Sequence, residues 1–449
     1  MASEPARIEP SDATRTPNAR EATVSLEHSD RHALPLSRVV AIGIGNALEF
    51  YDFLTFSFFA IQIGHAFFPE AQTSHGLLFS LATFGIGFFT RPLGGIVIGT
   101  YGDRVGRKPA MMLSFALMGV AIVGMALTPP YAQIGLAAPI LLLIFRLLQG
   151  FALGGEVGPS TALLIEAAPP HRRALYVAVQ SATQGLAILA AGAIGFILSH
   201  WLTPAALESW GWRCAFLIGA AVVPVGLYIR RSLPETSHAT DDPTLNPKER
   251  HIPVRLIVLS LLMLAAMTIT TYVRTYLTTY AQESLKLATD LAFGATVVNG
   301  LCGLLACPLA GLLADRVGRK PVMLTCVWIS AGLSVPSFLL MNHWHTAATV
   351  YGVTAVLSIA GWAGTLAVLT AITESLPRAV RSGALATIYA VAIALFGGST
   401  QFIVQWLIEA TGSPLAPAWY NTAALAIGGV AIMAMRETAP AKTAYAEEV

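Results

Sequence analysis

Long apolar stretches alternate with short polar ones along most of this chain. Roughly twenty consecutive apolar residues are enough for a helix to cross the hydrocarbon core of a bilayer. On that criterion the pattern predicts twelve membrane-spanning helices. They lie near residues 37–63, 75–101, 109–129, 136–167, 172–200, 212–231, 254–282, 290–314, 320–341, 346–375, 381–408 and 416–436. We therefore predict an all-α membrane protein.

The composition agrees with this pattern. Charged residues are 12% of the 449 residues, apolar residues are 55%, and the mean hydropathy is +0.64. Ordinary soluble domains carry roughly 25% charged residues, so this chain has too few charges to cover a water-facing surface. The four cysteines lie in or beside apolar stretches without the spacing of a zinc site or a disulfide framework, and we expect no metal.

Two sequence markers occur twice. Residues 102–109 read Gly-Asp-Arg-Val-Gly-Arg-Lys-Pro, and residues 314–321 repeat the motif with Ala in place of Gly, 212 residues later. Glu166, which precedes a Pro-Pro-His-Arg-Arg segment, is matched 208 residues later by Glu374, which precedes Pro-Arg-Ala-Val-Arg. Two markers at nearly the same spacing indicate two similar halves in tandem. Parallel repeats of this kind are typical of transporters whose site lies between the halves.

The repeat and the polar stretches divide the chain. Residues 1–35 are polar and predict a disordered cytoplasmic tail. Two six-helix bundles, at 36–231 and 254–436, are joined by a hydrophilic cytoplasmic linker at 232–253, and residues 437–449 form a second tail.

The distribution of basic residues predicts the orientation. Of the 27 Lys and Arg residues, 22 lie in the tails or in loops on one side of this topology. The loops at 129–136 and 341–346, on the other side, contain neither residue. By the positive-inside rule, both termini and both copies of the charged motif face the cytoplasm.

These motifs resemble the major facilitator superfamily, in which Gly-x-x-x-Asp-Arg-x-Gly-Arg-Lys separates spans two and three. Three further stretches, at Gly45–Phe53, Arg91–Gly95 and Arg146–Glu156, resemble its metabolite:proton symporter family. Within that family the chain is most similar to the citrate and tricarballylate symporters. That likeness is carried by Glu49–Asp52, Trp210–Arg213, Arg230–Thr236, and Ser413-Pro414 followed by Trp419.

The resemblance implies the major facilitator fold and transport by alternating access. It also implies a bacterial inner membrane protein that works as a monomer, is coupled to H⁺, uses no cofactor, and has a small anionic metabolite and the lipid bilayer as partners. No ATP-binding loop, nucleophile elbow or nucleic-acid-binding pattern is visible in the sequence. We therefore expect a transporter driven by an ion gradient and not an enzyme, with a transporter-like sensor as an alternative.

Six charged residues stand out within predicted spans, where a charge costs roughly 2.5–3.5 kcal/mol and usually faces a cavity or a partner. They are Glu49, Asp52, Arg91, Arg146, Glu156 and Arg274. We predict that Asp52 and Arg146 form the proton-coupling pair, because moving the cation away would favour protonation of the buried carboxylate. Glu49 and Glu156 are alternative proton carriers. A permanent ion pair that only fixes helix packing is the competing interpretation.

Arg91 and Arg274 suit an anionic substrate, because a guanidinium group binds a carboxylate through two parallel hydrogen bonds. One arginine from each half can hold a di- or tricarboxylate between them. For Arg91 the competing interpretation is local structure beside Pro92, and Arg274 departs from the subgroup, which is expected to have an apolar or hydroxyl residue there. Further candidate contacts, with helix packing as their alternative, are Gln180, Gln184, Tyr272 and Tyr276.

The two charged motifs are predicted to gate the transporter. Their charged residues are Asp103, Arg104, Arg107, Lys108, Asp315, Arg316, Arg319 and Lys320. We expect charge pairs among them to hold neighbouring helix ends together in one conformation. Topology alone would explain the basic residues but not the repeated aspartate.

The leading functional hypothesis is proton-coupled symport of a small carboxylate, either citrate or a related di- or tricarboxylate. The alternative is a proton symporter for a zwitterionic osmolyte, such as betaine or proline, or for another organic acid, such as shikimate or 2-oxoglutarate. Efflux of cationic drugs is disfavoured by the three arginines within the membrane.

Overall fold

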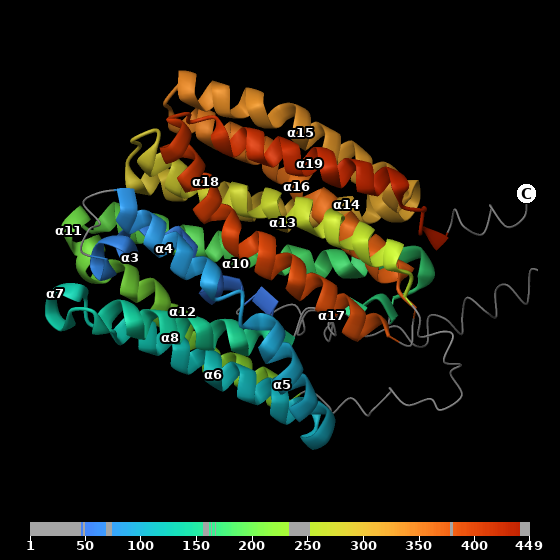
Figure 1. Cartoon of the computed structure of the whole chain (residues 1–449), viewed down its shortest axis with the longest axis horizontal. Coiled ribbons are helices and arrows are strands. Elements are labelled where there is room, and N and C mark those ends of the chain that lie inside the picture. The colour runs from blue at the N-terminus through green and yellow to red at the C-terminus, as the bar shows by residue number, and fades with distance from the viewer. Residues whose placement is uncertain are drawn as a thin grey trace, which may run out of the picture.

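The computed structural model describes residues 46–47, 50–68, 74–155, 161–162, 164–166, 168–232, 252–377 and 380–440. The predicted tail at 1–35 and most of the predicted linker lie outside these residues. Regular structure in the described part is helical, as predicted. Helices from the first half of the chain lie on one side of the molecule and helices from the second half on the other (Figure 1).

The first half begins with a helical stretch at 50–58. It continues as α3 (Ala60–Phe67), α4 (Ser74–Ile86), α5 (Arg91–Val105), α6 (Arg107–Leu127), α7 (Tyr131–Ile134), α8 (Ala137–Ala152), η2 (Leu153–Gly155), η3 (Pro170–Arg172), α10 (Arg173–Trp201), α11 (Pro204–Ala206), η4 (Leu207–Gly211) and α12 (Trp212–Ser232).

The second half contains longer uninterrupted helices. They are α13 (Val254–Glu283), α14 (Thr289–Val317), α15 (Arg319–His343), α16 (Ala347–Ser375), α17 (Arg381–Ala392) with the π-helical turn η6 (Ile393–Gly397), α18 (Gly398–Thr411) and α19 (Ala416–Ala434). Their bounds agree with the predicted spans to within a few residues.

Seven helices in the described part are long and apolar enough to cross a membrane. They are Gly76–Tyr101, Pro170–Trp201, Val254–Glu283, Thr289–Val317, Arg319–His343, Ala347–Ser375 and Arg381–Thr411. Two shorter apolar helices are Met112–Leu127 and Ala137–Ala152.

The second predicted span is divided where its arginine lies. α4 ends at Ile86 and α5 begins at Arg91, which places Pro92, a residue without a backbone N–H, in the first turn of α5, where it is best tolerated. At the break, the hydroxyl of Thr90 donates to the carbonyl of Leu147 on α8 at 2.8 Å. The break therefore sets Arg91 at a helix start that is tied to α8.

The motif glycine ends one helix and starts the next. Gly318 has a φ of 113°, in the region that favours glycine, and it lies between α14 and α15. Gly106 has a φ of 116° at the corresponding point between α5 and α6. This turn places Asp315 and Arg319 on either side of one loop. We call the end of the molecule at which this loop lies the motif end.

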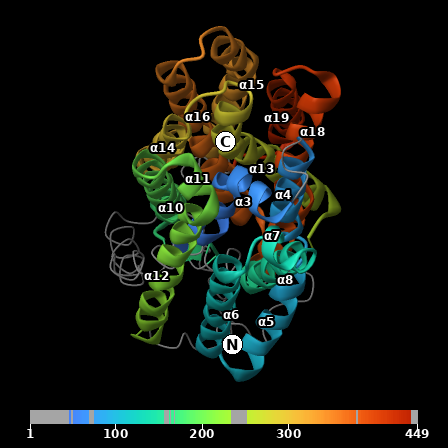
Figure 2. The same cartoon turned by 90° about the vertical axis from the view of Figure 1, so that its left-hand side faces the viewer.

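The two halves meet along two helix pairs, α10 with α14 and α4 with α18, which lie side by side in both views (Figures 1 and 2). Glycines allow the backbones to touch. A Cβ on Gly300 of α14 would lie 2.2 Å from the nitrogen of Leu189 on α10, and one on Gly85 would lie 2.2 Å from the carbonyl oxygen of Gly398. Small residues at helix contacts are how membrane helices pack closely.

The contact at Gly300 predicts a specific loss. In Gly300→Ala the new methyl group meets backbone atoms that cannot move aside, so we expect a loss of about 1–3 kcal/mol in stability, as for other overpacked sites. The melting temperature of the purified protein in detergent measures this. Gly332→Ala is the control, because no atom lies within 4 Å of a Cβ at that position. Equal melting temperatures for the two variants would contradict the close packing of α10 on α14.

Candidate functional site

Two arginines share one aromatic ring where the halves meet. The guanidinium carbons of Arg91 and Arg146 lie 4.4 and 4.0 Å from the ring centre of Phe53. Arg91 also lies 4.7 Å from the ring of Phe88, and Arg146 lies 4.8 Å from that of Phe84. Aromatic faces attract cations, and the attraction is stronger where water is excluded.

Tyr272 of α13 completes this group from the second half. Its ring centre lies 5.4 Å from that of Phe88 and 5.9 Å from that of Phe84, both edge to face. The structure thus brings the predicted site residues Arg91, Arg146 and Tyr272 together. We call the group formed by Phe53, Phe56, Phe84, Phe88, Arg91, Arg146 and Tyr272 the arginine–aromatic cluster.

Arg146 is fully buried and is held mainly by neutral acceptors. Its Nη1 donates to Oε1 of Gln149 at 2.5 Å and to the carbonyl of Phe53 at 3.4 Å, and its Nη2 donates to the carbonyl of Phe84 at 3.4 Å. No carboxylate of the described residues forms an ion pair with it. The positive charge is therefore shared among ring faces and helix carbonyls, which compensate it less well than an anion would.

Asp52 does not pair with Arg146 in this conformation. Its side chain is only 2% exposed, and its Oδ1 has no hydrogen-bond partner in the described structure. It faces α12, where a Cβ on Gly219 would lie 1.9 Å from Oδ1. Successive residues of a helix point about 100° apart, so Asp52 faces α12 while Phe53 faces Arg146. The coupling pair stays a prediction, and its alternatives Glu49 and Glu156 lie outside the described residues.

Arg274 belongs to a separate polar group in the second half. Its Nη1 donates to the carbonyl of Ser358 at 3.1 Å, and its Nη2 donates to the hydroxyl of Thr271 at 3.2 Å. The amide oxygen of Asn299 accepts hydrogen bonds from Ser358 at 2.9 Å and from Trp362 at 3.1 Å. The guanidinium carbon lies 5.3 Å from the Trp362 ring. Arg91 and Arg274 therefore lie in different polar groups, and their joint contact with one substrate stays a prediction.

Sequence reasoning missed Asn299, Ser358 and Trp362. A usable signal was present, because an amide and a tryptophan in the middle of apolar spans are uncommon away from the membrane interfaces.

The other predicted contacts lie apart from the cluster. Gln180 is buried and accepts a hydrogen bond from Thr161 at 2.9 Å. Gln184, one turn further along α10, is half-buried. The hydroxyl of Tyr276 donates to Gln405 on α18. Ser57 and Gln401 bond across the two halves at 2.9 Å and so add a link between the first span and α18.

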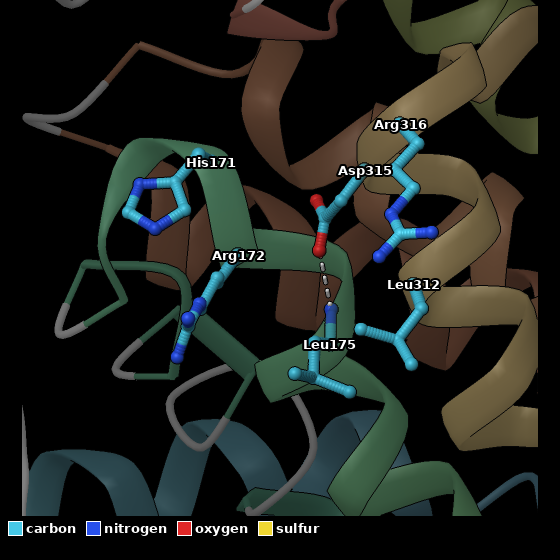
Figure 3. Close-up of a pocket in the computed structure, with 6 residues that line it drawn as sticks. All are labelled: His171, Arg172, Leu175, Leu312, Asp315 and Arg316. Carbon is cyan, nitrogen blue, oxygen red and sulfur yellow. Dashed lines mark hydrogen bonds between the residues drawn. The ribbon is translucent and has the colours of Figure 1, made fainter.

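At the motif end an aspartate of the second half caps a helix of the first. The carboxylate of Asp315 accepts a hydrogen bond from the backbone nitrogen of Ala174 at 3.1 Å. It accepts a second from that of Leu175 at 3.0 Å, also at the start of α10 (Figure 3). A negative charge is favourable at a helix N-terminus. Arg319, which is 1% exposed, lies 2.9 Å from Asp315 and binds Glu374 through Nε at 3.1 Å and Nη2 at 3.0 Å.

The remaining gating candidates differ in their surroundings. Arg316 lines a cavity of about 510 Å³ together with His171, Arg172, Leu175, Leu312 and Asp315 (Figure 3). Lys320 donates to the carbonyls of Met433 and Met435, each at 2.8 Å. Arg104 is exposed, and the side chains of Asp103, Arg107 and Lys108 lie outside the described structure. The second pair of repeat markers also meets across the halves, since Arg381 lies 3.4 Å from Glu166.

The segment after α19 is bound to the motif end. The carboxylate of Glu437 accepts the backbone N–H groups of Arg319 at 2.9 Å and Lys320 at 3.0 Å, and those of Thr438 and Ala439 at 2.9 Å each. Burial alone would raise the pKa of Glu437, but these four donors hold it below its ordinary value. The sequence indicated only a cytoplasmic tail from residue 437 onward.

The helices are long enough to span a membrane, they pack in two groups, and buried arginines lie where the groups meet. This arrangement is that of a multi-span membrane transporter. The chain belongs to the Major Facilitator Superfamily, whose family model matches residues 43–400. This confirms the predicted family and fold class.

The chain is similar to several bacterial transporters. It is 34% identical to the citrate-proton symporter of Klebsiella pneumoniae, over 87% of this chain and 89% of that protein. It is 33% identical to a proposed proline/betaine transporter of Staphylococcus aureus (88% and 86%) and to the alpha-ketoglutarate permease of Escherichia coli (86% and 90%). Since these relatives are transporters, the expectation that the chain is not an enzyme is confirmed.

Solved structures show the same fold. The partially occluded, inward-open xylose transporter XylE from E. coli superposes with a TM-score of 0.72 at 16% identity, over 89% of this chain and 97% of that one.

The cap formed by Glu437 predicts a pH-dependent loss of stability. Because the pKa of this carboxyl is lower in the folded protein than in the unfolded chain, the ionised group stabilises the fold at neutral pH. That contribution is lost as the pH falls through the folded pKa. Glu437→Gln should therefore lower the melting temperature at pH 7, by an amount that shrinks in acid.

Melting curves of both proteins across pH measure this difference. Glu283→Gln is the control, because Glu283 makes only a surface ion pair with Lys286 at 3.5 Å. A Glu437→Gln deficit that does not change with pH would contradict the role of the charge.

Proposed function

We propose that this protein is a proton-coupled symporter that takes up a small carboxylate, citrate or a related di- or tricarboxylate, by alternating access. The observation that carries the proposal is the arginine–aromatic cluster. Arg146 is fully buried and has no carboxylate partner among the described residues, and it shares the Phe53 ring with Arg91. An anionic substrate would supply a compensating charge that the described residues do not.

The two halves offer different contacts to such a substrate. Arg91 and Arg146 can bind one carboxylate through charge-assisted hydrogen bonds. Tyr272 reaches the same cluster from the second half, and Arg274 holds a second positive charge beside Asn299 and Trp362. A substrate with two or three carboxylates can engage both groups, which would draw the halves together around it.

The relatives support this reading. One is named a citrate-proton symporter and another an alpha-ketoglutarate permease, and both of these substrates are polycarboxylates. We further propose that the coupling ion is H⁺, that Asp52 carries it, and that the protein works as a monomer in a bacterial inner membrane with both termini in the cytoplasm.

A second candidate is a zwitterionic osmolyte, because another relative is a proposed proline/betaine transporter. Aromatic rings can hold a quaternary ammonium group. In this cluster, however, Phe53 is already in contact with two guanidinium groups, which would repel such a cation.

Replacing Arg91 tests the substrate class. In proteoliposomes with an imposed inward proton gradient, we expect radiolabelled citrate uptake at low substrate concentration to fall about 10- to 100-fold in Arg91→Gln, the loss of one charged hydrogen-bonding contact. Arg91→Lys should recover only part of it. Arg255→Gln, at an exposed arginine that bonds the carbonyl of Ala434, is the control.

Two results would count against the proposal. Citrate uptake by Arg91→Gln at the wild-type rate would show that Arg91 does not bind the substrate. Accumulation of betaine or proline by the wild-type protein, without citrate uptake, would show that the substrate is a zwitterionic osmolyte and not a carboxylate.

Replacing Asp52 tests the coupling. Asp52→Asn mimics a permanently protonated side chain, so we expect it to retain exchange of external for internal citrate while losing accumulation against a gradient. Asp290→Asn, the same change in the first turn of α14, should retain both exchange and accumulation. Accumulation by Asp52→Asn at the wild-type level would show that another residue carries the proton.

A further inference from the structure

Two neighbouring side chains of the first span face α12. The hydroxyl of Tyr51 donates to the carbonyl of Ala215 at 2.8 Å, which fixes the distance between the two helices. One turn beyond Ala215, Gly219 lies opposite Asp52. A Cβ on Gly219 would be 1.9 Å from Oδ1 of Asp52 and 2.9 Å from Cε1 of Tyr51. The carboxyl group therefore occupies the space that any other residue at position 219 would fill.

Among the residues that the structure describes, the groups around this carboxyl carry no compensating charge. On its own helix the neighbour is Tyr51, whose hydroxyl is already bonded to α12. On α12 the nearest cation is Arg213, six residues before Gly219, which donates to the carbonyls of Ala126 and Thr128. With Oδ1 unpartnered and the residue 2% exposed, the site suits a neutral carboxyl and not a carboxylate.

A charged alternative lies close to the same helix. Phe56, one turn beyond Asp52, has its ring centre 4.6 Å from the guanidinium carbon of Arg146. The arginine therefore borders the side of the helix that carries Phe53 and Phe56, next to the side that faces α12. Asp52 would exchange the uncharged position at Gly219 for one near Arg146 if the first span shifted or rotated relative to α8.

We propose that Gly219 is a positioning residue for proton coupling. Because it has no side chain, it leaves an uncharged space on α12, which we call the seat, and the protonated carboxyl of Asp52 occupies this space. The ionised carboxylate leaves this seat and pairs with Arg146. The proton is taken from water on one side of the membrane and released on the other, so no further reactant is needed. This inference rests on the proposed function, and in it Gly219 acts only through Asp52.

The inference predicts a shift of the pH profile. In Gly219→Ala the methyl group excludes the carboxyl from the seat, which disfavours the neutral form, so a higher proton concentration is needed to protonate it. We expect the half-maximal pH of gradient-driven citrate accumulation to move toward acid by about one unit or more, since each unit corresponds to about 1.4 kcal/mol. Exchange of citrate at saturating concentration should change much less.

Three further variants make the result specific. Gly352→Ala on α16 is the matched control, because no atom lies within 4 Å of the new Cβ, and its profile should not move. Asp52→Glu carries a longer carboxyl that does not fit the seat, so its profile should shift in the same direction even if Gly219→Ala does not fold. In an Asp52→Ala background, Gly219→Ala should cause no further loss of exchange, because no carboxyl remains to be displaced.

Two outcomes would overturn the inference. One is an unshifted pH profile in both Gly219→Ala and Asp52→Glu. The other is an equal loss of exchange and melting temperature when Gly219→Ala is added to wild type and to Asp52→Ala, which is the signature of damaged packing. Neither outcome bears on the proposed function. That proposal is contradicted instead if the wild-type protein shows no proton-driven carboxylate uptake.

Discussion

The structure depends on the compensation of guanidinium charge inside a bundle of apolar helices. A bare charge at membrane depth is costly, and Arg146 reduces the cost through ring faces, a glutamine and weak bonds to helix carbonyls. None of these neutralises the charge. The need to compensate this charge explains why the arginines lie where the two halves meet. There they are linked to Tyr272 of the second half through phenylalanines that both sides contact. This position also places the two arginines that we propose to bind the substrate where both halves can reach them.

Close helix packing keeps water away from these groups. Glycine contacts between α10 and α14 and between α4 and α18 bring backbones together, and at one end Phe59 packs on Phe293 at 4.9 Å. At the motif end, polar links are added to the close contacts. Asp315 caps α10, and Arg319 is shared between Asp315 and Glu374. A Cβ on Gly311 would lie 3.0 Å from the carbonyl oxygen of Ala174, so the helix backbones also approach closely here.

Much of the fold could be predicted, because hydropathy along the chain depends on each residue's own chemistry. The bounds of α13 to α16 followed from apolar runs in the second half. In the first half, Asp52, Arg91 and Arg146 stood out as charges within apolar runs. The directions in which these side chains point could not be predicted. Asp52 faces Gly219 and Arg274 faces Ser358 because of how each helix is rotated about its axis, and that rotation is set by packing between distant segments. The cap by Glu437 was missed because a polar segment after the last span has no periodicity to place it.

A carboxylate and a proton are proposed to move together through this protein. The most direct test uses proteoliposomes that contain a pH-sensitive dye, with no imposed gradient and with radiolabelled citrate added outside. We expect the interior to acidify as citrate enters, no acidification to occur without citrate, and liposomes lacking the protein to show neither signal. Citrate entry without acidification would contradict the coupling. Acidification driven by betaine but not by citrate would contradict the substrate.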